Sequence, residues 1–363
     1  DSNRQANLGS EAFLSMSLST MTKRERFLAA ARCQEVDRPP VWIMRQAGRY
    51  MPDYMEIRKT YSFKDLCNDP DVCSRVSLLP QDLLGVDALI IFNDILIPLE
   101  AMGLNVEFPS SGGPQIDNPP RDEASLDGFR PHLFSGPPVC TNLRTLRERA
   151  EPESAILGFA GAPLTLLGYA VEGKMTRNHE HIKRLLFESP DLAHEMLERI
   201  TETVVSYLAA QVQDGGADAV QLFESLASTL SSGDMDDFAL PYQQKVISRF
   251  KDACPDTPLI IFARGGANVL DAQVESGADV VSVEWTMTLA ETRRRVPETL
   301  ALQGNLDPMV LTVPDAVEAY ATAMLEGFDW TRGYIANLGH GITPQASVEG
   351  ARRFVRFIQN LKH

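Results

Sequence analysis

The sequence predicts an α/β protein built as a single (β/α)8 TIM barrel, with its active-site cleft at the C-terminal ends of the strands. Two observations lead to this prediction. Eight short apolar runs bounded by turn residues are spread along the 363 residues, and their hydrophobicity is mostly continuous rather than alternating, as a parallel sheet covered by helices requires. Most of the intervals between these runs carry an amphipathic helical pattern, so that strand and helix alternate along the chain.

The folded part is expected to begin at Met21. Thr22 is a suitable N-cap for a first helix, in which Phe27, Leu28 and Ala31 share one face. Residues 1–20 are rich in serine and lack a sustained apolar core, which is not the pattern of a secretory signal. We expect them to be a flexible N-terminal tail or a targeting remnant, and residues 21–363 to form the single barrel domain.

The predicted strands, in chain order, are 41–44, 88–92, 155–159, 219–223, 259–262, 280–284, 300–303 and 334–338. Two of the helical intervals, 189–213 and 314–326, are followed by glycine, the residue most common just after a helix. The interval 104–150 is rich in proline and glycine and predicts an inserted hairpin or loop, and 163–190 carries extra turns. The alternative is a doubly wound open sheet, but no G-x-G-x-x-G turn follows any strand.

Composition and charge limit the possible partners. The net charge of −15 and the pI near 4.9 argue against nucleic acid and against an anionic membrane surface. An anionic small molecule stays possible if its pocket gathers positive charge. No apolar run approaches the roughly 20 residues that span a bilayer, so we expect a soluble protein. The five scattered cysteines form no CxxC pair and no zinc motif, which favours a reducing compartment, either cytosol or plastid.

The segment 39–50 is the most informative part of the chain. Its apolar run 41–44 leads into Arg45 and Arg49, with Gln46 and a Gly48 hinge between them. Guanidinium groups stay charged and present planar forks of donors that suit carboxylates. A surface loop of salt bridges is the plain alternative. We favour an anion clamp, because helix-forming residues placed around a glycine make neither a helix nor a simple turn.

Polar residues follow the predicted strands, at the end where a barrel holds its site. In strand order these residues are 45 and 49, 93–94, 160–163, 224–225, 263–264, 284–285, 304–307 and 339–341. Asp94 is flanked by apolar residues, and is either a structural acceptor of loop amides or a partner for substrate N–H groups or a cationic intermediate. His340 lies between two glycines whose backbone freedom would let its ring enter the site, and no second histidine or cysteine stands nearby to share a metal.

Five further residues have a structural interpretation of equal or greater weight. Tyr169 is consistent with a core residue, and Ser225 with a cap of the helix after its strand. Arg58 would pair with a helix neighbour, and Glu284-Trp285 would be a packed aromatic beside a paired acid.

Together these residues resemble the uroporphyrinogen decarboxylase family. The matching segments run in family order across residues 22–360, and the arginine loop Met-Arg-Gln-Ala-Gly-Arg-Tyr at 44–50 is the most specific of them. The other matching segments are 91–96, 158–163, 169–173, 221–225, 303–308 and 337–341. The sequence departs from the usual family pattern at Leu226, at Glu284 and in the loop 262–266.

The resemblance implies a lyase of haem and chlorophyll biosynthesis, a homodimeric barrel that works without metal, cofactor or prosthetic group. Such an enzyme converts the four acetates of uroporphyrinogen III to methyls, giving coproporphyrinogen III and CO2. Substrate-binding positions would be Arg45, Ala47, Arg49, Arg58, Asp94, Tyr169, Ser225 and His340. Of these, Asp94, Arg45, Tyr169 and His340 would be catalytic, with Asp94 accepting the pyrrole N–H groups. The proton donor stays open between an arginine, a water and His340.

Two other functions compete with this one. A corrinoid- or thiol-linked methyltransferase on the same barrel would bind zinc through histidine and cysteine at strand ends, where this sequence has no cysteine. A non-catalytic tetrapyrrole carrier would use the same binding residues.

Overall fold

The computed structural model describes residues 21–109, 113–174 and 176–362. Its main sheet has seven parallel strands in the order β1-β4-β5-β6-β7-β8-β9, each paired with the next. The strands are β1 (Ala88–Ile90), β4 (Ala155–Gly161), β5 (Ala219–Glu224), β6 (Leu259–Ala263), β7 (Val280–Ser282), β8 (Ala301–Leu306) and β9 (Tyr334–Leu338). Seven of the eight predicted runs are therefore strands, and their almost complete burial matches their continuous hydrophobicity.

The remaining run closes the ring between β9 and β1. Val41 forms a parallel bridge with Ala336 of β9. The Ala336 N–H donates to the Pro40 carbonyl at 2.8 Å, and on the other side the Asp87 N–H donates to the Val41 carbonyl at 2.8 Å. The prediction of a regular strand over 41–44 is wrong, because the N–H groups of residues 41, 43 and 44 donate to side chains rather than to the carbonyls of a neighbouring strand. The segment nevertheless occupies the eighth position, which confirms the (β/α)8 barrel.

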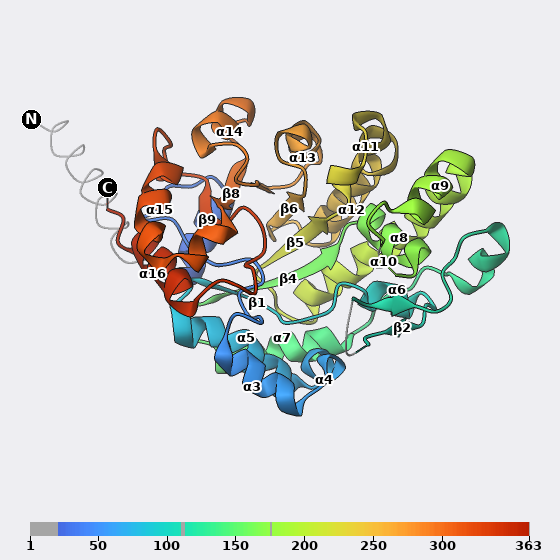
Figure 1. The fold of residues 1–363 in the computed structure, drawn as a ribbon, viewed down its shortest axis with the longest axis horizontal. Helices are drawn as coiled ribbons and strands as arrows, with labels where there is room; N and C mark the ends of the chain where they lie inside the picture. Colours follow the sequence, from blue (N-terminus) through green and yellow to red (C-terminus); the bar gives the residue numbers. More distant parts are fainter. Residues whose placement is uncertain (1–20, 110–112, 175, 363) are drawn as a thin grey trace, which may run out of the picture.

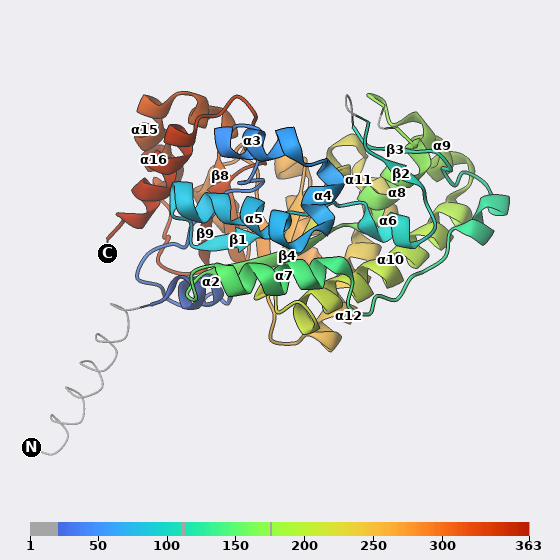
Figure 2. The same cartoon turned by 90° about the horizontal axis from the view of Figure 1, so that it is seen from below.

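Helices surround the sheet (Figures 1 and 2). They are α2 (Lys23–Ala31), α3 (Pro52–Thr60), α4 (Phe63–Asn68), α5 (Pro70–Leu84), α6 (Ile97–Ala101), α7 (Pro138–Arg149), α8 (Pro163–Glu172), α9 (Glu180–Glu188), α10 (Pro190–Gln213), α11 (Ser232–Phe238), α12 (Leu240–Ala253), α13 (Leu270–Glu275), α14 (Leu289–Arg295), α15 (Val317–Leu325) and α16 (Val348–Gln359). Thr22 caps α2 in a capping box with Glu25, as predicted. The interval 314–326 divides into a 3-10 turn, Pro314–Ala316, and α15.

The two long intervals have the expected content. Residues 104–150 contain a short antiparallel hairpin, β2 (Val106–Glu107) with β3 (Gln115–Ile116), followed by α7. Helices α8 and α9 account for the extra turns within 163–190. The predicted tail, residues 1–20, lies outside the described residues. None of the described helices has the length and apolar character needed to cross a membrane.

A chain of buried polar side chains links the closing segment to strands across the barrel. Trp42 Nε1 donates to Gln303 Oε1 on β8 at 3.0 Å. The Gln303 amide nitrogen donates in turn to Gln221 Oε1 on β5 and Ser282 Oγ on β7, both at 3.0 Å. All four side chains are buried, so each bond satisfies groups that would otherwise be costly to remove from water. The network holds residues 41–44 in register with the sheet.

We expect Asp87→Ala to destabilise the fold by about 3–5 kcal/mol, because it removes one partner of a buried ion pair. Asp87 is fully buried; it accepts from the Val41 N–H at 2.8 Å and from both terminal nitrogens of Arg38 at 2.8 Å. The control is Glu56→Ala, which breaks the exposed Lys59–Glu56 pair and should cost less than about 1 kcal/mol. Urea unfolding followed by circular dichroism measures both, and equal losses would contradict this account of barrel closure.

Candidate active site

The arginine loop is held by Gln46, whose side chain is buried beneath it. Gln46 Oε1 accepts from the Ile43 N–H at 3.1 Å, and Gln46 Nε2 donates to the Ala88 carbonyl at 3.1 Å. The Tyr50 hydroxyl donates to the Gln46 carbonyl at 2.8 Å. Arg45 adopts a left-handed backbone with φ of 61°, uncommon for a residue with a Cβ. The loop is thus neither helix nor simple turn. Arg49 is exposed, and Arg45 reaches solvent although its side chain packs against Gly341.

The arginine loop and the His340 loop pack directly against each other. The Ile342 N–H donates to the Met44 carbonyl at 2.9 Å. A Cβ on Gly341 would lie 2.5 Å from Arg45 Cδ, and one on Gly339 would lie 2.5 Å from the Trp285 nitrogen. Neither glycine has a positive φ, so the expectation that they supply unusual backbone angles is wrong. They are needed because their neighbours leave no room for a side chain.

Asp94 is a desolvated carboxyl group with one oxygen still available. It follows β1, and its side chain is buried. Oδ1 accepts from the Leu96 N–H at 3.1 Å, whereas Oδ2 has no hydrogen-bond partner among the described residues. Burial raises the pKa of Asp94 to about 7, and the charge of Glu100 acts in the same direction. Asp94 therefore combines the two roles that the sequence left open: one oxygen accepts a loop amide, and the other is an acceptor available to a ligand.

Tyr169 and His340 complete the group around Arg45. Tyr169, on α8, is half-buried; burial raises its pKa, and the charges of Arg45 and Asp94 both act on it, in opposite directions. Its phenol is therefore protonated at neutral pH and available as a donor. Burial lowers the pKa of His340, and the charges of Arg45 and Arg264 lower it further, so its imidazole is neutral at pH 7. The protein atoms packed around the Arg45 guanidinium partly desolvate it and lower its pKa, as do the charges of Arg264 and Arg49, but from so high a value that Arg45 remains a cation.

A cavity of about 330 Å³ opens beside His340. It is lined by Ser228, Arg264, Gly265, Glu284, Trp285 and His340. Trp285 is 41 % exposed and lines the cavity, so the interpretation of it as a packed aromatic is wrong. Glu284 Oε2 accepts from the Gly265 N–H at 3.2 Å. The sequence places Arg264 directly after the predicted strand 259–262, but Arg264 is not among the predicted site residues. Its position at a strand end is the signal that could have identified it.

The other three predicted substrate-binding residues have local contacts of their own, outside the group formed by Arg45, Asp94, Tyr169 and His340. Arg58, on α3, donates to the Tyr61 carbonyl at 2.8 Å. The Ser225 N–H donates to Thr165 Oγ1 at 2.7 Å, and the 3-10 turn that follows, Ala227–Thr229, has no side-chain cap, so the capping role is wrong. Ala47 is half-buried in the arginine loop. Substrate-binding roles for these three stay predictions.

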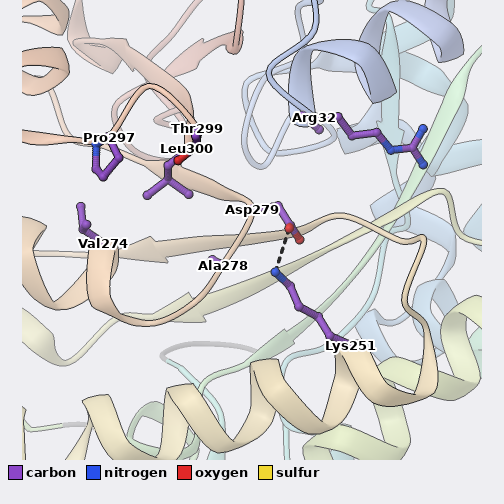
Figure 3. A pocket seen from close by; sticks show the side chains of 9 residues that line it. Arg32, Lys251, Val274, Ala278, Asp279, Pro297, Thr299 and Leu300 are labelled. Atoms are coloured by element: carbon purple, nitrogen blue, oxygen red, sulfur yellow. Dashed lines mark hydrogen bonds and ion pairs between the residues drawn. The ribbon is translucent and has the colours of Figure 1, made fainter.

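A second cavity, of about 440 Å³, lies at the opposite end of the barrel, where Asp279 and Leu300 immediately precede β7 and β8 (Figure 3). Its cations already have partners. Lys251 Nζ donates to Asp279 Oδ1 at 2.8 Å, and Arg32 donates to the Asp256 carbonyl at 2.9 Å. A TIM barrel carries stabilising rather than catalytic residues at this end, so the cavity beside His340 is the better candidate.

The fold and this site define an α/β-barrel enzyme that gathers Arg45, Arg49 and Arg264 at one barrel end of an acidic protein. Comparison with known proteins makes the class specific. The model of the uroporphyrinogen decarboxylase family matches residues 22–361. A uroporphyrinogen decarboxylase of Synechococcus sp. (strain CC9605) is 42 % identical to the chain, over 91 % of this chain and 94 % of its own length. A uroporphyrinogen decarboxylase of Trichormus variabilis is 41 % identical, over 92 % of this chain and 96 % of its own length. The chain belongs to the uroporphyrinogen decarboxylase family.

Solved structures confirm the barrel. A methyltransferase from Methanosarcina mazei superposes with a TM-score of 0.76 at 20 % identity, covering 94 % of this chain and 99 % of that one. A putative vitamin-B12 independent methionine synthase from Listeria monocytogenes gives a TM-score of 0.53 at 12 % identity, over 90 % of this chain and 96 % of its own. At such identities the likeness concerns the fold alone. Within the ranges that the structure describes, no three histidine, cysteine, aspartate or glutamate residues are grouped so as to hold a metal ion.

We expect Gly341→Ala to lower kcat/KM by about 10- to 100-fold, because the new methyl group would displace the Arg45 side chain from its position. The fold should persist, since the backbone of Gly341 suits any residue and the clash is with a flexible side chain. Steady-state kinetics and thermal unfolding measure the two effects. Gly128→Ala, where nothing lies within 4 Å of the added Cβ, is the matched control. Unaltered kinetics in Gly341→Ala would contradict the packing argument.

We expect Asp94→Asn to stabilise the protein at pH 8 but not at pH 4. The folded pKa of Asp94 is raised from 3.8 to about 7, so the folded state holds this proton more tightly than the unfolded state. The stability that this preference contributes is present at low pH and is lost as pH rises through 7. Asparagine carries no charge to desolvate. Urea unfolding at the two pH values measures the difference, and a variant less stable than the unaltered protein at pH 8 would count against a desolvated Asp94.

Proposed function

We propose that the chain carries out its family's reaction, the decarboxylation of the four acetate side chains of uroporphyrinogen III to give coproporphyrinogen III and four CO2. One observation supports this most strongly. Asp94, with a free buried oxygen, occupies the same barrel end as Arg45 and Arg49, for which the structure gives no ion-pair partner among the described residues. A substrate with pyrrole N–H donors and peripheral carboxylates complements both features.

Binding follows from the charges and donors at this barrel end. Arg45 and Arg49 would hold substrate carboxylates by charge-assisted hydrogen bonds, and Tyr169 and neutral His340 would add neutral donors. The free oxygen of Asp94 would accept the pyrrole N–H groups. Ala47 would contribute its backbone, and Arg58 and Ser225 would lie at the periphery. The acidic remainder of the surface would repel a polycarboxylate, so the local cations direct it to this end.

The chemistry needs only proton transfers and a stabilised cation. Protonation of the pyrrole at a ring carbon makes the ring an electron acceptor. The bond between the acetate methylene and its carboxylate then breaks, its electron pair enters the ring, and CO2 leaves. The methylene carbon takes up a proton, the ring carbon releases its own, and the net change replaces CO2 by one proton. Carboxylate Asp94 stabilises the cationic ring in this low-dielectric site.

The source of the proton stays open between Arg45, His340 and a water. Arg45 is a cation whose pKa is lowered only from a very high value, which makes it a weak acid. His340 is neutral in the free protein, so it would donate only after a bound carboxylate has raised its pKa. Tyr169, close to both Arg45 and Asp94, would orient the reacting acetate.

The same proposal covers the domain, the compartment and the assembly of the protein. Residues 21–363 act as one catalytic unit that needs no cofactor. The protein works in the reducing environment of cytosol or plastid, as a homodimer. All five cysteines are buried and free, as expected for such a compartment. Met309, 52 % exposed beyond β8, is a candidate for burial against a second copy. Sedimentation velocity gives the assembly state, and a single species of monomer mass would contradict the dimer.

Anaerobic incubation of metal-free protein with uroporphyrinogen III, followed by chromatography, should show hepta- to tetracarboxylate products. Asp94→Asn should lower kcat by about 10²- to 10³-fold, because it removes the charge that stabilises the cation. Arg45→Ala should raise KM by about 10-fold or more, because it removes charge-assisted hydrogen bonds to the substrate. Absence of product, or strict dependence on zinc or a corrinoid, would defeat the proposal. Binding of the porphyrinogen without turnover would instead indicate a carrier.

A further inference from the structure

The geometry points to a second carboxylate-binding subsite, in which Arg264 and His340 hold a propionate side chain of the substrate within the cavity lined by Ser228, Arg264, Gly265, Glu284, Trp285 and His340. This inference rests on the proposed function and extends it. It assigns a role to a residue outside the arginine loop, and it concerns the side chains that the reaction leaves intact.

Arg264 offers an uncommitted charge to this cavity. Its side chain is exposed, and no carboxylate among the described residues pairs with it. The cavity volume of about 330 Å³ leaves room for a flexible side chain with a terminal carboxylate. Arg264 is also close enough to Arg45 and His340 for its charge to lower the pKa of each. An anion placed among these groups would relieve their mutual repulsion.

The loop after β6 fixes the place from which Arg264 projects. The Arg264 N–H donates to the Glu224 carbonyl at 2.9 Å, and the Gly265 N–H donates to Glu284 Oε2 at 3.2 Å. Gly265 and Gly266 have φ of 142° and 57°. A Cβ on Gly266 would lie 2.2 Å from Thr286 Oγ1, so a larger residue there would be strained in its backbone and would clash with that side chain. The loop that departs from the family pattern is therefore a constrained support for this arginine.

The strand order separates this subsite from the reacting group. In the ring β1-β4-β5-β6-β7-β8-β9, β6 is three positions away from β1, which carries Asp94 at its end. Arg264 thus lies nearly across the barrel end from the carboxylate assigned to the reacting pyrrole. A side chain bound at Arg264 while an acetate reacts near Asp94 belongs to another part of the macrocycle.

The other lining residues suit a propionate. Neutral His340 has a ring N–H to donate to a carboxylate, and the exposed Trp285 ring offers an apolar surface for the two methylene groups. Glu284 lines the same cavity and repels an anion, which places the carboxylate toward Arg264 and His340 rather than at the Glu284 side. Propionates persist through all four steps, so this subsite would hold substrate, intermediates and product alike.

The product provides the discriminating probe, because coproporphyrinogen III retains its propionates and has lost every acetate. For Arg264→Ala we expect about a 10-fold rise in both the KM for uroporphyrinogen III and the inhibition constant for coproporphyrinogen III, with kcat within about 2-fold. For Arg264→Lys both constants should lie between those of the unaltered protein and of Arg264→Ala, since lysine keeps the charge but lacks the paired N–H donors of a guanidinium group. Arg356→Ala, an exposed arginine on the outer helix α16, controls for the change in net charge and should alter neither constant.

Each other outcome overturns the subsite. An unchanged KM in Arg264→Ala would show that Arg264 binds no part of the substrate. A raised KM with an unchanged inhibition constant would mean that the group held there is an acetate. A lower kcat with unchanged KM would move Arg264 into the chemical step. A thermal midpoint equal to that of the unaltered protein confirms that the variant is folded. No turnover by the unaltered protein would refute the proposed function itself, a result distinct from unchanged constants in an active variant.

Discussion

The closure of the parallel sheet by residues 39–44 is the constraint on which the rest of this structure depends. Asp87 accepts from the Val41 N–H and from Arg38, and Trp42 enters a buried network through Gln303. These bonds hold a segment whose N–H groups go mainly to side chains, so that it forms no regular ladder. Because the chain leaves that position directly into the arginine loop, the bonds that complete the barrel also determine where Arg45 and Arg49 emerge.

The site gathers positive charge, whereas the protein as a whole is strongly negative. The chain carries a net charge of −15, yet Arg45, Arg49 and Arg264 lie at one barrel end without a carboxylate partner among the described residues. Their mutual repulsion is a cost in the free protein, and a polycarboxylate removes it on binding. Asp94 adds a second cost, because its carboxyl group is kept from water and one of its oxygens has no hydrogen-bond partner among the described residues. A ligand that is anionic at its rim and rich in N–H donors at its centre satisfies both.

Sequence patterns located the strands because burial on both faces demands continuous hydrophobicity, and they placed Arg45, Asp94 and His340 because catalytic side chains follow barrel strands. They failed where the outcome depended on distant neighbours. Gly339 and Gly341 are required by the nearness of Trp285 and Arg45, contacts that local backbone preference does not show. The sequence favours packing for Trp285, since nothing in its own segment indicates that its ring lines a cavity.

By itself, the sequence determined the barrel, the family and the residue types of the site, because these depend on periodicity and on motifs a few residues long. Only the tertiary structure decided which charged groups are desolvated and which lie together. Asp94 has a pKa of about 7 because residues from several elements enclose it, and Arg264 joins His340 because β6 and β9 direct their ends into one cavity. Electrostatic energy depends on distance and burial, and both are properties of the folded chain rather than of any one segment.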